Sequence, residues 1–327
     1  MVRVAILGAG GMGRIHSGNL SSMDGVEVVA VCDVSAAAAE SLAGRLGCAA
    51  YASMDEMLGE ARLDAAYICI PPYAHGGQFE AFARRGIHVF IEKPINISLK
   101  RAGAMVEAAA EGGIVSQVGY HFRFGAAVRE LRRRVAAGSA GRPVLFAGSF
   151  QCNSLHSPWW RDRSKCGSQI LEQVIHTYDI AMHLFGRPSE VTAFMANVGH
   201  ADVEGYTLED VSAASVRFAC GALGSISATN CAVPMRWDNP FTAVYERLTV
   251  RFKGPGEATF VTTEGGTASS EELVDGQDLY KAEDAHFISS VRGGADPACD
   301  VGEGYASLAF VDAAMRSARG GGAIVRL

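Results

Sequence analysis

The sequence predicts an α/β protein with two domains: an N-terminal doubly wound parallel sheet, and a C-terminal α+β domain with a large, mostly antiparallel open sheet. Three observations support this prediction. Strand-like and helix-like segments alternate up to residue 118, several strand-like segments follow one another directly after residue 186, and 327 residues exceed what one core usually holds. The change of pattern places the boundary near Gly119, which gives domains at residues 1–119 and 120–327.

The N-terminal domain begins with a run of aliphatic and β-branched residues, and similar runs recur between helix-like segments. This alternation is typical of β-α-β units in a parallel sheet. Strands are predicted at residues 2–7, 26–32, 65–70, 87–91 and 114–118, and helices at 14–20, 35–46, 53–58, 74–85 and 98–111. Pro71 and Pro72 end the third strand, because proline cannot donate a hydrogen bond to a sheet.

The C-terminal domain has a different pattern, in which strands are joined by turns rather than by helices. Such a pattern favours an antiparallel sheet. Strands are predicted at residues 143–152, 190–198, 211–219, 222–230, 245–252 and 258–262, helices at 126–137, 168–185, 280–291 and 303–317, an irregular loop at 153–165, and a polar loop at 263–270.

The composition narrows the classes of partner and compartment. The net charge of −6 does not suggest a surface for nucleic acid or for an anionic membrane, and the chain has no run of 18 apolar residues. The eight cysteines are scattered without a Cys-x-x-Cys pair, which favours small buried side chains in a reducing compartment over disulfides or a zinc site. We therefore expect a cytoplasmic protein that binds neither nucleic acid nor membrane.

Residues 8–13 read Gly-Ala-Gly-Gly-Met-Gly and lie between the first strand and the first helix. In such a turn Gly8 permits the tight bend, Gly10 lets the backbone approach a pyrophosphate, and Gly13 lets the helix pack on the strand. A strand–helix turn without a ligand is the alternative. Asp33 lies 20 residues past Gly13 at the end of the second strand, and it favours a dinucleotide site, because a carboxylate there accepts hydrogen bonds from the adenosine ribose.

The same carboxylate predicts that NAD is preferred over NADP. Asp33 would repel a 2′-phosphate, and residues 34–39 offer no basic side chain to compensate. A basic side chain from elsewhere, such as Arg14, would narrow the preference.

Two more segments follow buried strands at the edge where ligands of open parallel sheets lie. Lys93 comes directly after one strand and before a proline, so its ammonium is expected to point into the cofactor crevice, where it could polarise a carbonyl or stabilise an alkoxide. A solvated lysine is the alternative. His75 is expected to contact phosphate or nicotinamide, or to lie on the surface; His16 and His88 are expected to be packing or surface residues. The predicted cofactor contacts are Gly8, Gly10, Gly11, Met12, Gly13, Asp33, Ile70, Pro71, Pro72, His75, Glu92 and Lys93.

The helix predicted at residues 168–185 carries Glu172, His176, Asp179 and His183 within a stripe roughly 60° wide. Three interpretations compete: a solvent-facing stripe with favourable ion pairs, a metal site, or a general acid/base at His176 that Glu172 or Asp179 orients. A metal is least favoured, because the chain has no His-Glu-x-x-His motif and no further ligand cluster stands out, so we expect none.

Aromatic and basic residues near the domain junction are candidates for binding a hydroxylated ring. Trp159, Trp160 and Arg161 lie in one loop; indole faces stack on sugar rings, and guanidinium groups bind hydroxyls or phosphates. The alternative is that at least one tryptophan fills a domain interface. Tyr120 and Arg123 are expected to line the same cleft.

In this order and spacing the motifs resemble the glucose–fructose oxidoreductase/inositol dehydrogenase/rhizopine-catabolism (Gfo/Idh/MocA) family over nearly the whole chain. Besides the glycine turn, the resemblance rests on residues 71–75 (Pro-Pro-Tyr-Ala-His), 92–94 (Glu-Lys-Pro), 119–124 (Gly-Tyr-His-Phe-Arg-Phe), and 167–179. It implies an N-terminal Rossmann domain and a C-terminal open sheet that often forms a dimer or tetramer interface. It also implies oxidation of a sugar or cyclitol hydroxyl, or reduction of the ketone, with NAD or NADP.

The resemblance further implies residue roles. Lys93 corresponds to the family lysine that acts at the reacting oxygen, and His176 to its usual proton acceptor or donor. Many members carry aspartate four residues before that histidine, in an Asp-x-Gly-x-His run, whereas Glu172 and Val174 stand here. A subgroup with Gly-Gln-Ile-x-Glu-Gln resembles this version. Glu172 is therefore expected to bind a substrate hydroxyl or to orient His176, and the substrate is not carried over from the aspartate-bearing members.

The resulting hypothesis is an NAD(P)-dependent dehydrogenase or reductase acting on a sugar, cyclitol or related polyol or ketose, with Lys93, His176 and Glu172 as catalytic residues. We expect a homodimer or homotetramer through the C-terminal sheet. An NAD-using glycosidase of the same fold and a non-enzymatic dinucleotide-binding regulator are the alternatives, and intact Lys93 and His176 argue against the regulator. The expected substrate contacts are Tyr120, Arg123, Trp159, Trp160, Arg161, Glu172 and His176.

Overall fold

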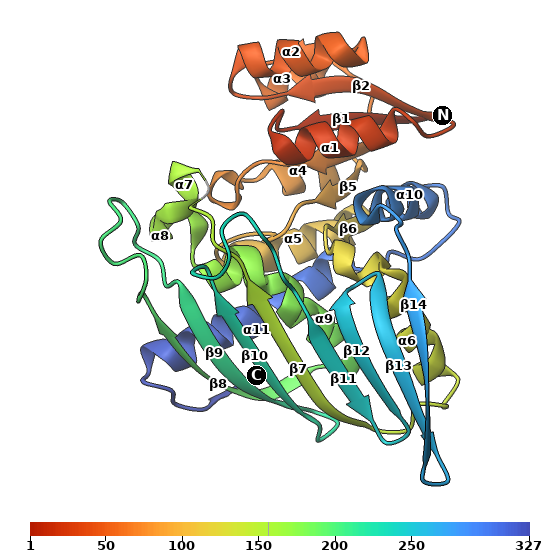
Figure 1. The fold of residues 1–327 in the computed structure, drawn as a ribbon. Helices are drawn as coiled ribbons and strands as arrows, with labels where there is room; N and C mark the ends of the chain where they lie inside the picture. The colour runs from red at the N-terminus through yellow and green to blue at the C-terminus, as the bar shows by residue number, and fades with distance from the viewer. Residues whose placement is uncertain (156) are drawn as a thin grey trace. The chain divides into compact units, whose positions relative to one another are not determined.

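The computed structural model describes residues 1–155 and 157–327. The chain divides into two compact units, each described on its own below (Figure 1). The first unit consists of Met1–His121 and Asp278–Tyr305, and the second of Phe122–Gln277 and Ala306–Leu327. The division therefore differs from a single cut after Gly119, because a late segment of the chain returns to the first unit.

The first unit is built on a six-stranded parallel sheet in the order β3-β2-β1-β4-β5-β6. The chain order reverses at β1, which pairs with β2 on one side and β4 on the other; ligands of open α/β sheets bind at such a switch point. The predicted parallel sheet is confirmed, with one short strand, β3, that the sequence did not indicate. The strands are β1 (Val2–Leu7), β2 (Val26–Cys32), β3 (Ala49–Tyr51), β4 (Ala65–Ile68), β5 (His88–Ile91) and β6 (Ser116–Val118). The helices are α1 (Gly11–Leu20), α2 (Ala36–Leu46), α3 (Met54–Glu60), α4 (Gln78–Ala83), α5 (Leu99–Gly112) and α10 (Leu279–Val291), with a 3₁₀ turn at Pro72–Ala74. A second 3₁₀ turn, His121–Phe124, begins at the last residue of this segment and continues into the second unit.

Helix α10 belongs to the core of the first unit although it lies late in the chain. Phe287 is fully buried and contacts Tyr67 of β4 and Phe90 of β5, with ring centroids 5.5 and 5.7 Å apart. Both partners are themselves fully buried, as parallel strands covered on two faces require. Residues 278–305 therefore complete a hydrophobic core that residues 1–121 begin.

The second unit contains a nine-stranded sheet in the order β14-β13-β12-β11-β7-β10-β9-β8-β15. The pair β10–β7 is parallel and the other pairs are antiparallel, which confirms the predicted mostly antiparallel sheet. The strands are β7 (Pro143–Gln151), β8 (Pro188–Ala196), β9 (Val211–Phe218), β10 (Leu223–Thr229), β11 (Phe241–Tyr245), β12 (Leu248–Gly254), β13 (Glu257–Glu264), β14 (Thr267–Val274) and β15 (Val325–Arg326). The helices are α6 (Ala126–Ala136), α7 (Pro158–Arg161), α8 (Arg163–Cys166), α9 (Ile175–Phe185) and α11 (Val301–Arg319), which begins in the last residues of the first unit.

The polar loop predicted at residues 263–270 is wrong. These residues form the β13–β14 hairpin, whose turn contains Gly265 and Gly266 at φ +56° and +82°. Strand β14 lies at the edge of the sheet and is exposed along nearly all its length, so it lacks the apolar alternation by which a strand is detected. The irregular loop predicted at 153–165 likewise contains the short helices α7 and α8.

Helix α9 packs against one face of this sheet (Figure 1). Phe185 contacts Phe146, Phe218 and Tyr245 on three strands, with ring centroids 5.7, 5.4 and 5.3 Å apart. Along β9 and β10 residues alternate between buried and exposed, so one face of the sheet forms the core and the other stays open.

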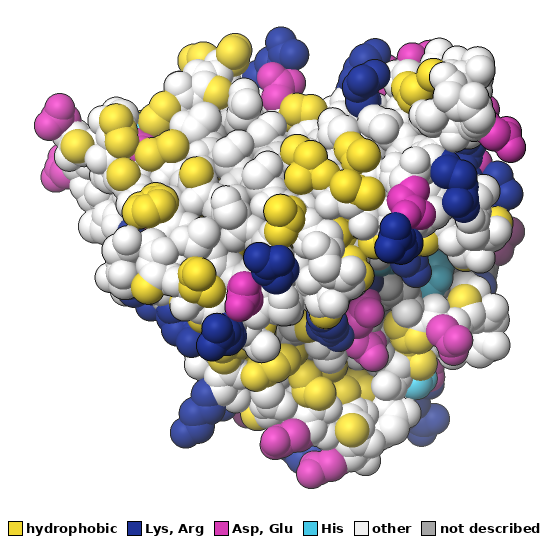
Figure 2. Space-filling view, turned by 90° about the horizontal axis from the view of Figure 1, so that it is seen from below, with side chains coloured by type: hydrophobic (Ala, Val, Ile, Leu, Met, Phe, Trp, Pro, Cys, Tyr) yellow, Lys and Arg dark blue, Asp and Glu magenta, His cyan; other side chains and the backbone are white. Residues whose placement is uncertain are grey.

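None of the helices in the described ranges, 1–155 and 157–327, is long and apolar enough to cross a membrane. On the face seen in Figure 2, lysine and arginine side chains are interspersed with aspartate and glutamate. That face carries no large patch of one charge.

Candidate active site

In the turn after β1, the surroundings of each glycine explain why a residue without a side chain stands there. Gly8 has φ +104°, and a Cβ there would lie 2.6 Å from the carbonyl oxygen of Cys69. A Cβ on Gly13 would lie 1.9 Å from the carbonyl oxygen of Gly8, so only glycine lets α1 pack this closely on the turn. Beside Gly10 and Gly11, by contrast, a Cβ would meet nothing within 4 Å, which leaves open space at the N-terminus of α1.

The carboxylate of Asp33 lies beside this turn. One oxygen accepts the backbone N–H of Ala9 and the other accepts that of Ser35, both at 2.8 Å. Arg14 also reaches the turn, where its guanidinium donates to the carbonyl oxygen of Ala9 at 3.0 Å. Open space beside two glycines, a helix N-terminus with no side-chain cap and a carboxylate at the end of β2 fit a dinucleotide, with its phosphates on α1 and its ribose at Asp33.

His75 joins two segments of the first unit, and its predicted contact with the cofactor stays a prediction. One ring nitrogen lies 2.7 Å from the carbonyl oxygen of Ile95, and the other 3.1 Å from that of Ile70. Burial lowers the pKa of His75 below its usual value. The ring therefore ties the segment after β4 to the segment after β5, and both of its nitrogens face protein.

Lys93 follows β5 directly, and the preceding residue fixes its backbone. Glu92 is 6% exposed, and one of its oxygens accepts the backbone N–H of Lys93 at 3.1 Å. The other oxygen lies 3.0 Å from Nε2 of His16. These contacts of Glu92 hold the end of the strand, and its predicted contact with the cofactor stays a prediction.

His16 is a packing residue, one of the two roles expected for it, and it is also part of a buried charge cluster that the sequence did not indicate. It is fully buried, and its Nδ1 lies 2.7 Å from Asp284 of α10, so each ring nitrogen faces a carboxylate. Burial opposes its charge, but hydrogen bonds with Asp284 and Glu92 outweigh burial and raise the pKa of His16 to about 10. The ring is therefore an imidazolium that donates from both nitrogens.

Glu283 is the fourth member of this cluster. It is fully buried, and neither of its carboxyl oxygens has a hydrogen-bond partner among the described residues. Burial and the nearby charge of Glu92 raise the pKa of Glu283 well above its usual value, which favours the protonated form of this carboxyl. The cluster holds one cation against two carboxylates, Glu92 and Asp284.

The polar stripe predicted on one continuous α-helix begins in a π-helical turn, which contains Glu172, and continues along α9. Ile170–Val174 form a π-helical turn, and α9 begins at Ile175. His176 is 6% exposed and stacks on the ring of Phe122, with centroids 5.0 Å apart. Single π-helical turns inside α-helices are frequent at functional sites. The solvent-facing interpretation of the stripe is therefore wrong for His176.

Asp179, the second predicted partner of His176, is engaged elsewhere. It is fully buried and binds the guanidinium of Arg123 with both oxygens, at 2.8 and 2.7 Å, while Ser307 donates to it at 2.8 Å. Arg123, predicted to bind substrate, is only 5% exposed. Burial and the charges of Arg123 and Arg132 lower the pKa of His183, farther along the stripe, to about 3.

The predicted aromatic contacts lie mostly in the interior. Trp160 is 2% exposed and packs with Cys166, Tyr206 and Leu208, with Trp159 partly buried against them. The indole N–H of Trp160 donates to Glu172 at 2.8 Å. Trp160 thus packs against residues of the second unit, and its indole N–H holds one oxygen of Glu172.

Two more of the predicted substrate contacts are held by the protein itself. The guanidinium of Arg161 donates to the carbonyl oxygen of Leu155 at 2.8 Å, and Tyr120 is fully buried.

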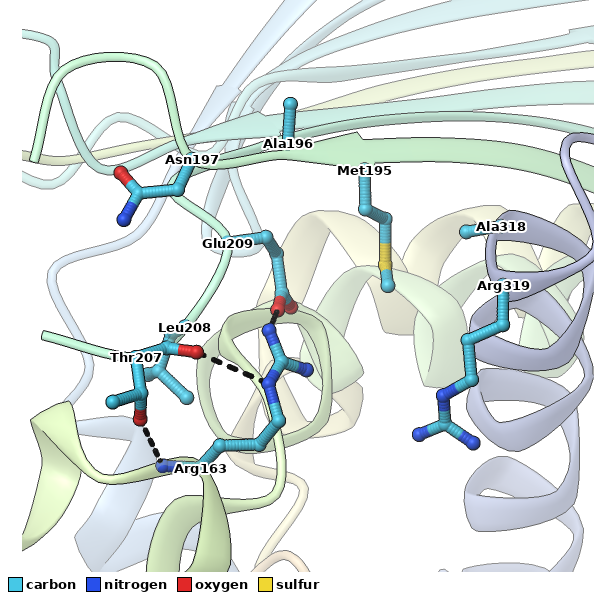
Figure 3. A pocket seen from close by; sticks show the side chains of 9 residues that line it. All are labelled: Arg163, Met195, Ala196, Asn197, Thr207, Leu208, Glu209, Ala318 and Arg319. Atoms are coloured by element: carbon cyan, nitrogen blue, oxygen red, sulfur yellow. Dashed lines mark hydrogen bonds and ion pairs between the residues drawn. The ribbon is translucent and has the colours of Figure 1, made fainter. Parts of the chain in front are cut away.

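A pocket of about 480 Å³ in the second unit contains none of the predicted site residues. In it Arg163 donates to Glu209 at 2.9 Å and to the carbonyl oxygen of Thr207 at 3.1 Å (Figure 3). Arg319 of α11 lines the opposite side (Figure 3). This pocket therefore plays no part in the candidate active site.

The fold and the glycine turn define a class: a dinucleotide-binding protein of the Rossmann type with a second α+β unit. Residues 2–120 match the model of the oxidoreductase family with an NAD-binding Rossmann fold, GFO_IDH_MocA, and residues 128–251 match the GFO/IDH/MocA C-terminal domain. The chain belongs to this family. It is an oxidoreductase, and its cofactor is NAD.

Named relatives extend over nearly the whole chain. The scyllo-inositol 2-dehydrogenase (NAD(+)) of Bacillus subtilis (strain 168) is 29% identical over 306 residues, which cover 90% of this chain and 88% of that protein. The inositol 2-dehydrogenase of Rhizobium meliloti (strain 1021) is 28% identical over 333 residues, covering 97% and 96%. A levoglucosan dehydrogenase solved with NADH and levoglucosan has the same fold, with a TM-score of 0.90, 20% identity and 99% of each chain covered.

Proposed function

We propose that this protein is an NAD-dependent dehydrogenase that interconverts a secondary hydroxyl and a ketone on a sugar, cyclitol or related polyol. The names of the two inositol dehydrogenases support this substrate class. The supporting observation from the structure is the position of Lys93. It follows β5 at the same edge of the parallel sheet as the glycine turn, and Glu92 fixes its backbone.

In this proposal Lys93 and His176 both act at the reacting oxygen. His176 accepts the hydroxyl proton during oxidation, and the Lys93 ammonium stabilises the oxygen as negative charge develops on it. NAD, when bound, supplies the hydride acceptor. The glycine turn, α1 and Asp33 bind it.

In this proposal Glu172 positions either the substrate or His176. Trp160 donates to one of its oxygens at 2.8 Å, which limits the orientations of the carboxylate. A carboxylate so held binds a substrate hydroxyl with its second oxygen or orients His176.

We also propose that NAD is preferred over NADP. Asp33 already stands at the turn that the cofactor approaches, and its negative charge would repel a 2′-phosphate. Arg14, the side chain that could compensate, donates to the backbone of the same turn, which directs its guanidinium toward Ala9.

The proposed assembly is a homodimer or homotetramer through the open face of the nine-stranded sheet, and the proposed location is the cytoplasm. Exposed apolar side chains on the strands of the nine-stranded sheet support an interface at this sheet: Val144, Leu145, Phe194 and Leu223 are 47%, 41%, 64% and 49% exposed. Light scattering after size-exclusion chromatography should give two or four times the chain mass of 34.4 kDa.

The experiment that tests the function is a screen of inositols, sugars and anhydrosugars with NAD and NADP, followed by variants on the substrate found. Lys93→Ala and His176→Ala should each lower kcat by about 10²–10⁴-fold. Lys100→Ala, at an exposed site on α5, is the matched control and should leave kcat unchanged. Near wild-type turnover of either site variant would refute the assignment. Release of an aglycone without net NADH would identify a glycosidase, and cofactor binding without turnover would identify a regulator.

A further inference from the structure

We propose that the second unit carries a binding site for a thiophilic divalent cation of the Zn²⁺ class, formed by His200, Asp210 and Cys231. Nδ1 of His200 lies 3.2 Å from a carboxylate oxygen of Asp210 and 3.3 Å from Sγ of Cys231. All three potential ligand atoms lie within 4.8 Å of one another. Imidazole, thiolate and carboxylate are the ligands that zinc takes in proteins.

The three residues come together at one end of three adjacent strands. His200 follows β8, Asp210 immediately precedes β9, and Cys231 follows β10. The backbone of Asp210 joins these strand ends, because its N–H donates to Ala196 at 2.9 Å and its carbonyl accepts from Asn230 at 2.7 Å. The site is therefore part of the sheet's framework, and sequence spacing does not reveal it.

The distances suit a metal ion. With Zn–N and Zn–O bonds of about 2.0–2.2 Å and a Zn–S bond of about 2.3 Å, tetrahedral angles separate nitrogen from oxygen by about 3.4 Å and nitrogen from sulfur by about 3.6 Å. The observed separations, 3.2 and 3.3 Å, differ from these by a few tenths of an ångström. Small side-chain movements would admit the ion.

The three groups contact one another in pairs, since Cys231 also hydrogen-bonds with Asp210. Nδ1 of His200 carries either one proton or one lone pair, yet both Asp210 and Cys231 converge on it. A cation at the centre would bind all three atoms at once. Binding of the cation would displace the proton of the thiol.

Neighbouring groups hold two of the ligands in place. The His200 ring stacks on Tyr206 with centroids 5.0 Å apart, and the Asp210 carboxylate accepts the backbone N–H groups of Val198, Gly199 and His200 at 2.7–2.8 Å. Supporting contacts of this kind orient metal ligands. A Cβ on Gly199 would lie 2.6 Å from the sulfur of Cys231, so glycine gives the thiol its room.

The site is open on one side. His200 and Asp210 are buried, whereas Cys231 is exposed, so an ion can enter at the sulfur and keep a water as its fourth ligand. The scattered cysteines predicted buried side chains and no metal site. Cys231 and Cys220 differ from that prediction, because both are exposed. The other cluster of potential ligands, at His16, is fully buried, and both nitrogens of its histidine are hydrogen-bonded to carboxylates.

The test is metal binding by the full chain after chelation and reduction. One Zn²⁺ per chain should bind, in competition with a chromophoric chelator, and Co²⁺ should give a thiolate-to-metal charge-transfer band. Cys231→Ser should abolish that band and weaken Zn²⁺ binding by about tenfold or more. Cys220→Ser, which removes the other exposed thiol, should change neither.

His200→Gln gives an independent measurement, with far-UV circular dichroism to verify folding. It should also weaken Zn²⁺ binding about tenfold or more. Absence of stoichiometric Zn²⁺ binding, a Co²⁺ spectrum without the thiolate band, or equal affinity in wild type and Cys231→Ser would each overturn the proposal. Because none of these readouts depends on turnover, failure here leaves the proposed dehydrogenase function untouched.

Discussion

Replacing His16 with leucine should destabilise the first unit strongly. Leucine is similar in size to histidine, so the main loss is the imidazolium that both Asp284 and Glu92 contact at 2.7 and 3.0 Å. Removing one partner of a buried ion pair costs about 3–5 kcal/mol, because the remaining charge has no compensation. For a unit of this size each kcal/mol lowers Tm by about 2–4 °C, so the Tm of the first unit should fall by roughly 6–20 °C.

The assay must report on the first unit specifically. The three tryptophans, Trp159, Trp160 and Trp237, all belong to the second unit, so their fluorescence follows the other half of the molecule. Far-UV circular dichroism follows both units, so the unfolding of the first unit is the part of the urea or thermal transition of His16→Leu that tryptophan fluorescence does not report. Tryptophan fluorescence of the same samples provides the internal control.

A double-mutant cycle with Glu92→Gln separates charge from packing. In the wild type, Glu92→Gln removes an ion-pair partner and destabilises; in His16→Leu it removes an uncompensated charge and should cost less or even stabilise. The coupling between the two sites should reach about 1–3 kcal/mol. If the two losses simply add, the buried charge does not stabilise this unit and our account of the cluster is incorrect.

Three more predictions follow from the first unit. The folded pKa of His16, about 10, lies above its unfolded value near 6.5, so the stability that its charge contributes is full below pH 6.5 and is lost as pH rises toward 10. The raised pKa of Glu283 acts in the same direction. Urea unfolding at pH 7–10 should therefore show a free energy of unfolding that decreases with pH, and the decrease should be smaller in His16→Leu. Gly13→Ala should abolish NAD binding or folding of the turn, because its Cβ would lie 1.9 Å from the Gly8 oxygen, whereas Gly11→Ala, which meets nothing within 4 Å, should fold normally by circular dichroism. Titration of both oxidised cofactors should favour NAD by about tenfold to a hundredfold, or roughly 1–3 kcal/mol, and Asp33→Ala should reduce that ratio; tighter NADP binding by the wild type would contradict the assignment.

Local patterns predicted much of the first unit. A few dozen consecutive residues contain the strand before Gly8, the glycine spacing up to Gly13, and Asp33. The structure gives a geometric reason for the glycines and for the position of Asp33. The position of Lys93 just after a buried strand was predicted in the same way, and its role at the reacting oxygen stays a prediction.

Contacts between distant segments could not be predicted in this way. His16 and Asp284 are 268 residues apart, and nothing near His16 in the sequence supplies a carboxylate for either of its nitrogens. Periodicity placed His176 and Asp179 on one stripe, but it does not reveal that Arg123 binds the aspartate. Trp160 likewise looks like a sugar-stacking residue until its burial and its bond to Glu172 are known.

The return of residues 278–305 to the first unit has a consequence for synthesis on the ribosome. Phe287 and Asp284 emerge only after all of residues 122–277 have been translated, which takes roughly 8–30 s at about 5–20 residues per second. During that interval the nascent N-terminal segment lacks the aromatic ring that contacts Tyr67 and Phe90, and His16 lacks one of its two carboxylates. The NAD-binding half of the molecule therefore reaches its complete core late in translation, and a fragment cut after His121 would expose an unfinished apolar surface that a chaperone recognises.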